Sequence, residues 1–120
     1  MKELLRKHHI SFQAAISGLV WSLSTQPNFR IHFFLSAAAL SAAYFLHITR
    51  IELIVVVFTI VLGLVAEMIN TAIESVTDLV TTEWKEKAKI AKDVSAGMML
   101  TVAIGAVIVA GLIFWPYIKI

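Results

Sequence analysis

The chain of 120 residues is short enough to form a single domain, and 59% of its residues are hydrophobic. A soluble domain of this size could not bury so much apolar surface, so the composition favours a protein that lies in a membrane. The net charge of +2 is too small to favour nucleic acid as a partner, and the absence of cysteine excludes disulfides and thiolate chemistry.

The first predicted element is an amphipathic helix over residues 1–26 that lies on the membrane surface. Apolar residues from Leu5 to Leu23 recur at helical spacing, with basic residues between them. No signal-peptide cleavage pattern follows this segment, so we expect it to belong to the mature protein. Gln26 and Pro27 then end the helix, because a proline disfavours helical backbone in the residue before it.

Three further helices, over residues 29–48, 51–82 and 92–118, are predicted to contain transmembrane spans. The run Ile31–Ile48 holds 18 residues without Lys, Arg, Asp or Glu, and Val94–Ile118 holds 25. A spanning helix needs roughly 20 apolar residues, and a helix satisfies its own backbone hydrogen bonds in lipid. The sequence therefore predicts an all-α membrane protein with one surface helix and three transmembrane helices.

The distribution of basic residues predicts the topology. A turn joins the first two spans, and Thr49 and Glu52 have the spacing of a capping box that marks the start of the second. Eight basic residues fall on one side and two on the other, namely Lys2, Arg6, Lys7, Arg30, Lys85, Lys87, Lys89 and Lys92 against Arg50 and Lys119. Basic residues gather in the cytoplasm, so we expect a cytoplasmic amino terminus and an external carboxyl terminus.

A polar stripe on the second span is the most informative feature. At about 100° per residue, Glu67, Asn70, Glu74 and Asp78 fall within roughly 80° of one another. Glu67 lies about 24 Å along the helix from Ile51, near the inner edge of the hydrocarbon, where an ionisable group is costly. The stripe could be the solvated face of an emerging helix, an equal alternative for Asp78. For Glu67 the apolar neighbours favour a functional carboxylate that could act as a general base.

Three charged residues near the predicted cytoplasmic surface have two interpretations each. Lys92 could hold a phosphate and Asp93 a hard cation, and the simpler interpretation is a membrane anchor and a helix N-cap. Arg30 could bind a substrate phosphate or extend to lipid headgroups. Spacing alone favours the simpler interpretation in each case. The four histidines show no metal-ligand spacing, and no familiar phosphate-binding loop is present.

Two motifs resemble the bacterial diacylglycerol kinase family of small membrane lipid kinases, namely E-M-I-N-T-A-I-E-S-V-T-D at 67–78 and A-K-D at 91–93. The segment N-F-R-I-H at 28–32 resembles the undecaprenol kinase branch of Gram-positive bacteria. The resemblance implies a multi-pass homotrimer in the bacterial inner or plasma membrane. It also implies that MgATP phosphorylates a lipid alcohol at the cytoplasmic face. Undecaprenol is the expected lipid, and diacylglycerol is the alternative.

The resemblance implies a role for each matched residue. Glu67 is expected to be the catalytic base, with Asn70 as its polar neighbour and Glu74 as a magnesium ligand. The lipid site is expected to include Asn28, Arg30, Glu67 and Asn70. The implied nucleotide contacts are Lys7, Glu74, Glu83, Lys85, Lys92 and Asp93.

One position departs from the family pattern. The family has a glutamate four residues before the arginine as a second metal ligand, whereas this chain has Gln26. An amide oxygen can bind magnesium but adds no charge, so we expect weaker metal binding with Gln26 still a ligand. A catalytically silent interaction subunit is an alternative function. A proton- or ion-coupled carrier is less favoured, because the first and third spans contain no ionisable residue at mid-bilayer.

Overall fold

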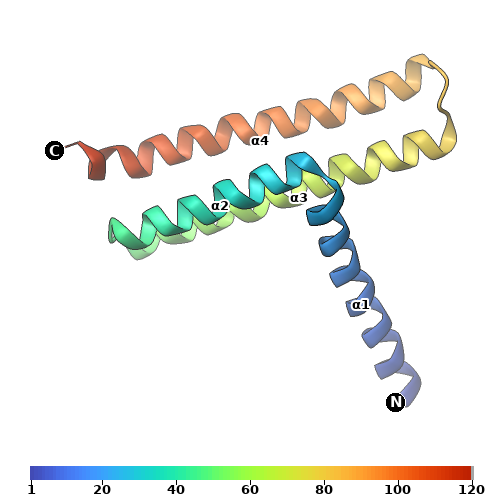
Figure 1. The fold of residues 1–120 in the computed structure, drawn as a ribbon, viewed down its shortest axis with the longest axis horizontal. Coiled ribbons are helices and arrows are strands. Elements are labelled where there is room, and N and C mark those ends of the chain that lie inside the picture. Colours follow the sequence, from blue (N-terminus) through green and yellow to red (C-terminus); the bar gives the residue numbers. More distant parts are fainter. Residues whose placement is uncertain (120) are drawn as a thin grey trace.

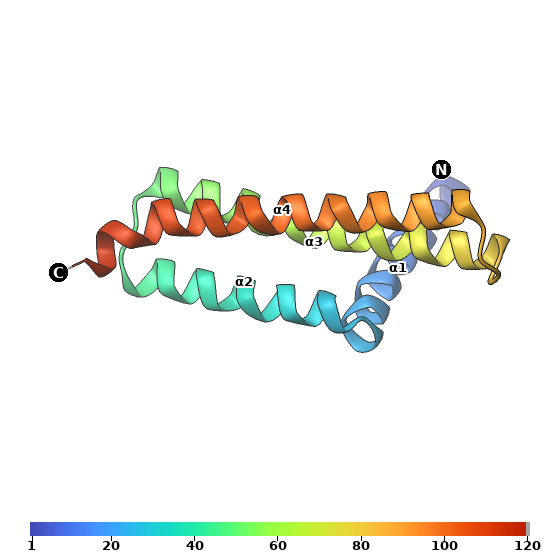
Figure 2. The ribbon, with the colours of Figure 1, turned by 90° about the horizontal axis from the view of Figure 1, so that it is seen from above.

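The computed structural model describes residues 1–119, and these form an all-helical protein (Figure 1). The helices are α1 (Lys2–Thr25), α2 (Pro27–Phe45), α3 (Arg50–Val80) and α4 (Glu86–Ile118). Helices α3 and α4 form a long hairpin, α2 packs along α3, and α1 projects away from the other three (Figures 1 and 2). The predicted all-α fold is confirmed for this part of the chain.

The break between α1 and α2 lies where the sequence predicts it. Gln26 has extended backbone, with φ −99° and ψ 108°, and caps both helices. Pro27 is the first residue of α2, where the missing N–H costs no hydrogen bond. Helix α2 therefore starts two residues before the predicted position 29. It also ends at Phe45 instead of 48, because His47 adopts a left-handed φ of 50° and closes the helix.

The start of α3 is fixed by the predicted capping box. Thr49 Oγ1 accepts a hydrogen bond from the Glu52 backbone N–H at 3.3 Å, and Glu52 Oε2 accepts one from the Thr49 N–H at 2.7 Å. The Tyr117 hydroxyl also donates to Glu52 Oε2, at 2.6 Å. This hydrogen bond ties the carboxyl end of α4 to the first turn of α3. Helix α3 runs from Arg50 to Val80, against the predicted 51–82.

Helix α4 begins six residues earlier than predicted, at Glu86 instead of 92. Its N-cap is Lys85, and Glu86 in the first turn complements the helix dipole. Only residues 81–85 connect α3 to α4, so most of the segment between the motifs at 67–78 and 91–93 is helical. Asp93 lies inside α4, and its interpretation as a helix N-cap was wrong. The predicted end at 118 is confirmed.

Helices α3 and α4 are long and apolar enough to cross a membrane. Only 22% and 6% of their apolar windows are buried, which argues against core helices of a soluble protein. At 1.5 Å per residue they are about 46 and about 50 Å long, so each extends beyond a hydrocarbon core of about 30 Å. Among the residues described, α2 does not meet the same test, and its role as a third span stays a prediction.

Candidate active site

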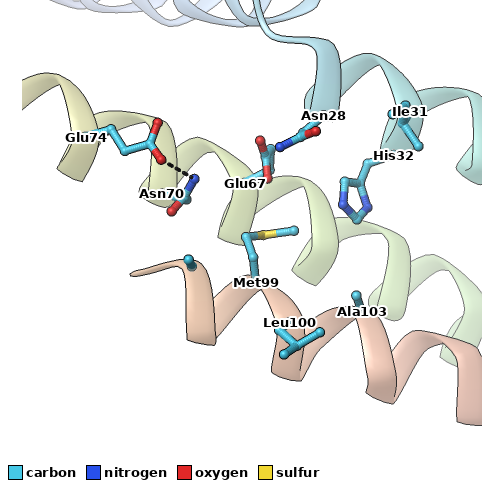
Figure 3. A pocket seen from close by; sticks show the side chains of 10 residues that line it. Asn28, Ile31, His32, Glu67, Asn70, Glu74, Met99, Leu100 and Ala103 are labelled. Carbon is cyan, nitrogen blue, oxygen red and sulfur yellow. Dashed lines mark hydrogen bonds between the residues drawn. The ribbon is translucent and has the colours of Figure 1, made fainter. Parts of the chain in front are cut away.

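A pocket of about 370 Å³ lies between α2, α3 and α4 (Figure 3). Helix α3 contributes a polar wall, α4 an apolar one, and α2 residues of both kinds. The polar residues are Asn28 and His32 from α2 and Glu67, Asn70 and Glu74 from α3, and the apolar ones include Ile31, Met99, Leu100 and Ala103. The predicted polar stripe of α3 therefore faces a pocket along most of its length, and Asp78 lies beyond it.

Glu67 is the most buried carboxylate of this wall, with 3% of its surface exposed. It lies in the middle of α3, where helical periodicity directs it toward α2, and its side chain extends toward Asn28 (Figure 3). A buried ionisable group within an apolar helix is costly to keep, which favours a functional role over a structural one. The burial of Glu67 between the helices is observed, and its predicted depth in the membrane stays a prediction.

Asn70, one turn further along α3, is held by a residue of α4. The Ser95 hydroxyl donates to Asn70 Oδ1 at 2.7 Å, and both residues are buried. Asn70 Nδ2 donates to Glu74 Oε1 at 3.5 Å, which is long for a hydrogen bond (Figure 3). Glu74 itself is exposed at the polar end of the pocket. The Ser95 contact was not predictable from the sequence, because the two residues are 25 positions apart on different helices.

The predicted nucleotide-binding residues of the loop and of α4 lie at the α3–α4 turn, outside the pocket wall. Lys92 Nζ lies 2.6 Å from Asp78 Oδ1, and Lys85 Nζ lies 3.4 Å from Glu83 Oε2. Asp93 forms an ion pair with Lys89 on the same helix. All three pairs are exposed to solvent. Each of these charged groups of the loop and of α4 is thus already paired with an opposite charge.

Three further predicted site residues do not line the pocket of the single chain. Lys7 is exposed on the part of α1 that projects away from the other helices (Figure 1). Arg30 is exposed on α2, and the Gln26 amide donates to Thr25 Oγ1 at 3.1 Å. Their predicted roles stay predictions.

The carboxylate oxygens of Glu74 at the pocket could bind a hard cation whose other ligands are phosphate oxygens. Across residues 1–119, no three Asp, Glu or His side chains are grouped closely enough to hold a metal ion by themselves. Glu74 offers an exposed carboxylate at the pocket, whereas Asp78 and Asp93 are paired with lysines. Magnesium is often held by one or two carboxylates together with phosphates and water, so Glu74 is a suitable ligand.

His32 lines the pocket, although the spacing of the four histidines predicted no role for them. It also lines a second, more apolar groove of about 320 Å³ between the same three helices, which shares Ala103 with the pocket. This groove runs beside small and aliphatic residues that include Ala39, Gly63, Leu64, Ala106 and Ala110. The spacing of Asn28 and His32, one helical turn apart, could have indicated the shared face.

Long apolar helices around a pocket with a buried glutamate define a membrane protein with a polar site between three of its helices. The family model of the prokaryotic diacylglycerol kinases matches residues 13–114. The chain therefore belongs to this bacterial family of membrane lipid kinases.

Three relatives share sequence with most of this chain. The diacylglycerol kinase of Synechocystis sp. is 45% identical over 108 residues, which cover 89% of this chain and 62% of that protein. The chain thus spans less than two thirds of the Synechocystis protein. The undecaprenol kinase of Bacillus subtilis is 33% identical over 113 residues, covering 93% of this chain and 91% of the relative. The diacylglycerol kinase of Haemophilus influenzae is 29% identical over 106 residues, covering 88% and 90%.

Proposed function

We propose that this chain transfers the γ-phosphoryl group of ATP to the hydroxyl group of a membrane lipid alcohol. The observation that carries the proposal is the buried carboxylate of Glu67 in a pocket between an apolar groove and a charged helix end. The groove suits a hydrocarbon chain, and the charged end suits a nucleotide. Membership of a lipid kinase family supports the same reaction.

The proposed reaction needs a proton acceptor for the lipid hydroxyl and residues that hold this hydroxyl in line with the γ-phosphorus. Glu67 takes the proton of the lipid hydroxyl as its oxygen forms a bond to the γ-phosphorus. The bond from that phosphorus to the bridging oxygen breaks, and ADP leaves. Asn28 and Asn70 offer amide groups that can hold the hydroxyl in line. Phosphoryl transfer depends mainly on such positioning and on charge neutralisation.

In this proposal, charged residues near the α3–α4 turn neutralise the negative charge of the ATP phosphates. Lys92 and Lys85 offset the charge of the ATP phosphates, with Glu83, Asp93 and Lys7 as further nucleotide contacts. Glu74 holds magnesium, with Gln26 as a neutral second ligand. When bound, the cation would supply charge neutralisation between the phosphates of ATP. Lys92 is paired with Asp78, so the phosphate has to replace that carboxylate.

Two lipids are candidates, and a specific observation favours each. The segment N-F-R-I-H at 28–32 favours undecaprenol, and its residues Asn28 and His32 line the pocket. The 45% identity to a protein named diacylglycerol kinase favours diacylglycerol. Both lipids carry a primary alcohol at the membrane surface, where Glu67 is proposed to act.

The proposal includes an assembly and a topology. Helix α2 serves as the first of three spans, the amino terminus and the α3–α4 turn face the cytoplasm, and the carboxyl terminus lies outside. The amino end of α2 points toward the same end of the bundle as the α3–α4 turn, although the hairpin extends beyond it, and this direction supports the arrangement (Figure 2). A homotrimer would bring Lys7, Gln26 and Arg30 of one chain near the pocket of another.

A phosphorylation assay tests the proposed function. The purified full chain in mixed micelles is incubated with radiolabelled ATP and magnesium, with either undecaprenol or diacylglycerol as the acceptor. We expect labelled lipid phosphate from at least one of them, and the ratio of kcat/KM values identifies the lipid. If neither lipid is labelled although the protein is folded, the kinase proposal fails and a silent interaction subunit takes its place.

A further inference from the structure

Ser95 of α4 has a buried hydroxyl that the proposed reaction leaves without a role. Only 2% of the residue is exposed, and it does not line the pocket. Its Oγ lies 2.7 Å from Asn70 Oδ1 and 3.0 Å from the Lys92 backbone oxygen. By contrast, the hydroxyl of Ser22, also buried, donates at 2.9 Å to a carbonyl of its own helix. Ser95 thus connects α4 to a polar residue of α3.

The neighbours of Asn70 determine which way its amide faces. The Glu74 carboxylate can only accept a hydrogen bond when ionised, so the NH2 group of Asn70 has to face Glu74. Asn70 Oδ1 then faces Ser95, which has to donate its single hydroxyl proton to it. Ser95 therefore donates a hydrogen bond to Asn70, and Asn70 donates one to Glu74. The bond to Ser95 is short and buried, whereas the bond to Glu74 is long, so Ser95 fixes the amide.

We propose that Ser95 is a positioning residue that holds the Asn70 amide toward Glu74 and thereby orients the Glu74 carboxylate for cation binding. This inference rests on the proposed function, because the cation is the one that Glu74 is proposed to bind with the nucleotide. Ser95 acts through Asn70 and has no contact with the pocket. Without its hydroxyl, the amide can turn and Glu74 loses a fixed donor.

Two measurements on the full chain in detergent micelles separate this role from simple helix packing. Mn²⁺ binding in the presence of a non-hydrolysable ATP analogue is followed by the electron paramagnetic resonance signal of free Mn²⁺, and unfolding is followed by thermal melting. We expect Ser95→Ala to weaken Mn²⁺ binding about fivefold, the size expected for one hydrogen bond. Ser22→Ala, which removes a buried hydroxyl bonded only to its own helix, should leave Mn²⁺ binding unchanged.

Two further variants make the test specific. In an Asn70→Ala background, Ser95→Ala should weaken Mn²⁺ binding by less than about twofold more, because residues that act through one another are not additive. Ser95→Cys replaces the hydroxyl by a somewhat larger thiol that donates weakly, so it should weaken Mn²⁺ binding with the melting temperature largely retained. This variant carries the test if Ser95→Ala does not fold.

The inference is overturned if Ser95→Ala or Ser95→Cys lowers the melting temperature without changing Mn²⁺ binding. It is also overturned if Ser95→Ala weakens Mn²⁺ binding equally in both backgrounds, or if the parent chain binds no Mn²⁺. The proposed function fails separately. In that case the parent chain makes no lipid phosphate, whereas the coupling between Ser95, Asn70 and Mn²⁺ binding persists.

Discussion

Lys92 of α4 and Asp78 of α3 form an ion pair, with 2.6 Å between Nζ and Oδ1, next to the turn that joins the two helices. The side chains are 41% and 55% exposed, so solvent screens the pair and its two partners can separate. A phosphate group that binds Lys92 has to compete with Asp78. The carboxylate therefore weakens nucleotide binding in the proposed reaction.

Replacement of Asp78 by asparagine tests this competition. Asp78→Asn should lower the KM for ATP by about twofold to fivefold, the range expected for an exposed ion pair, with kcat little changed. Steady-state kinetics at saturating lipid measure both constants. Glu86→Gln removes one negative charge from the first turn of α4 and controls for net charge. A higher KM for ATP in Asp78→Asn would instead mean that Asp78 helps to hold the nucleotide.

The role of Glu67 is tested by an isosteric change. Glu67→Gln keeps the shape of the side chain but cannot accept the hydroxyl proton, so turnover should fall at least about a hundredfold. Nucleotide binding and the melting temperature should be largely retained. Glu3→Gln on the exposed surface of α1 is the matched control. Near-parental turnover of Glu67→Gln would leave the carboxylate with a structural role only.

The magnesium dependence should respond to Gln26 and Glu74 in opposite directions. Gln26→Glu adds a charged ligand, so the magnesium concentration for half-maximal rate should fall. Glu74→Gln removes the only charged ligand of the proposed pair, so activity should be lost at any practical magnesium concentration. Rates across a magnesium titration measure both effects. Unchanged dependence in the first variant together with full activity in the second would show that neither residue binds the metal.

Labelling from the two sides of the membrane tests the topology. A reporter fused after residue 120 should be external, because most basic residues lie at the other end of the spans. A tag inserted in the turn at residues 81–85 should react only from the cytoplasm. Reversed labelling would move the proposed nucleotide site to the wrong side of the membrane.

The helix boundaries that depend on local chemistry were predictable from the sequence. The break at Gln26 and Pro27 and the capping box of Thr49 and Glu52 involve residues at most three positions apart. The start of α4 was misplaced because the charged segment 86–91 was assigned to a loop. Lysine, glutamate and alanine favour helices, and a spanning helix can continue into water beyond the lipid.

Helical periodicity alone could predict the candidate site only where it lies on one helix, and Asn28 of α2 was added by the family resemblance. Glu67, Asn70 and Glu74 were found together because helical periodicity places them on one face. The contacts of Ser95 with Asn70 and of Lys92 with Asp78 depend on the register of α4 against α3. That register is determined by side-chain packing along two long helices, which a single sequence does not reveal.

The Tyr117–Glu52 hydrogen bond has a consequence for how a lipid reaches Glu67. Helices α3 and α4 are connected at one end by the five residues 81–85 and at the other end by the Tyr117–Glu52 hydrogen bond. Both ends of the helix pair are therefore held together. Helix α2 packs on α3, makes few contacts with α4 and has its proline junction beside the pocket. We therefore expect the distance between α3 and α4 to stay constant. Helix α2 is expected to move instead, so that lipid enters between α2 and the other two helices.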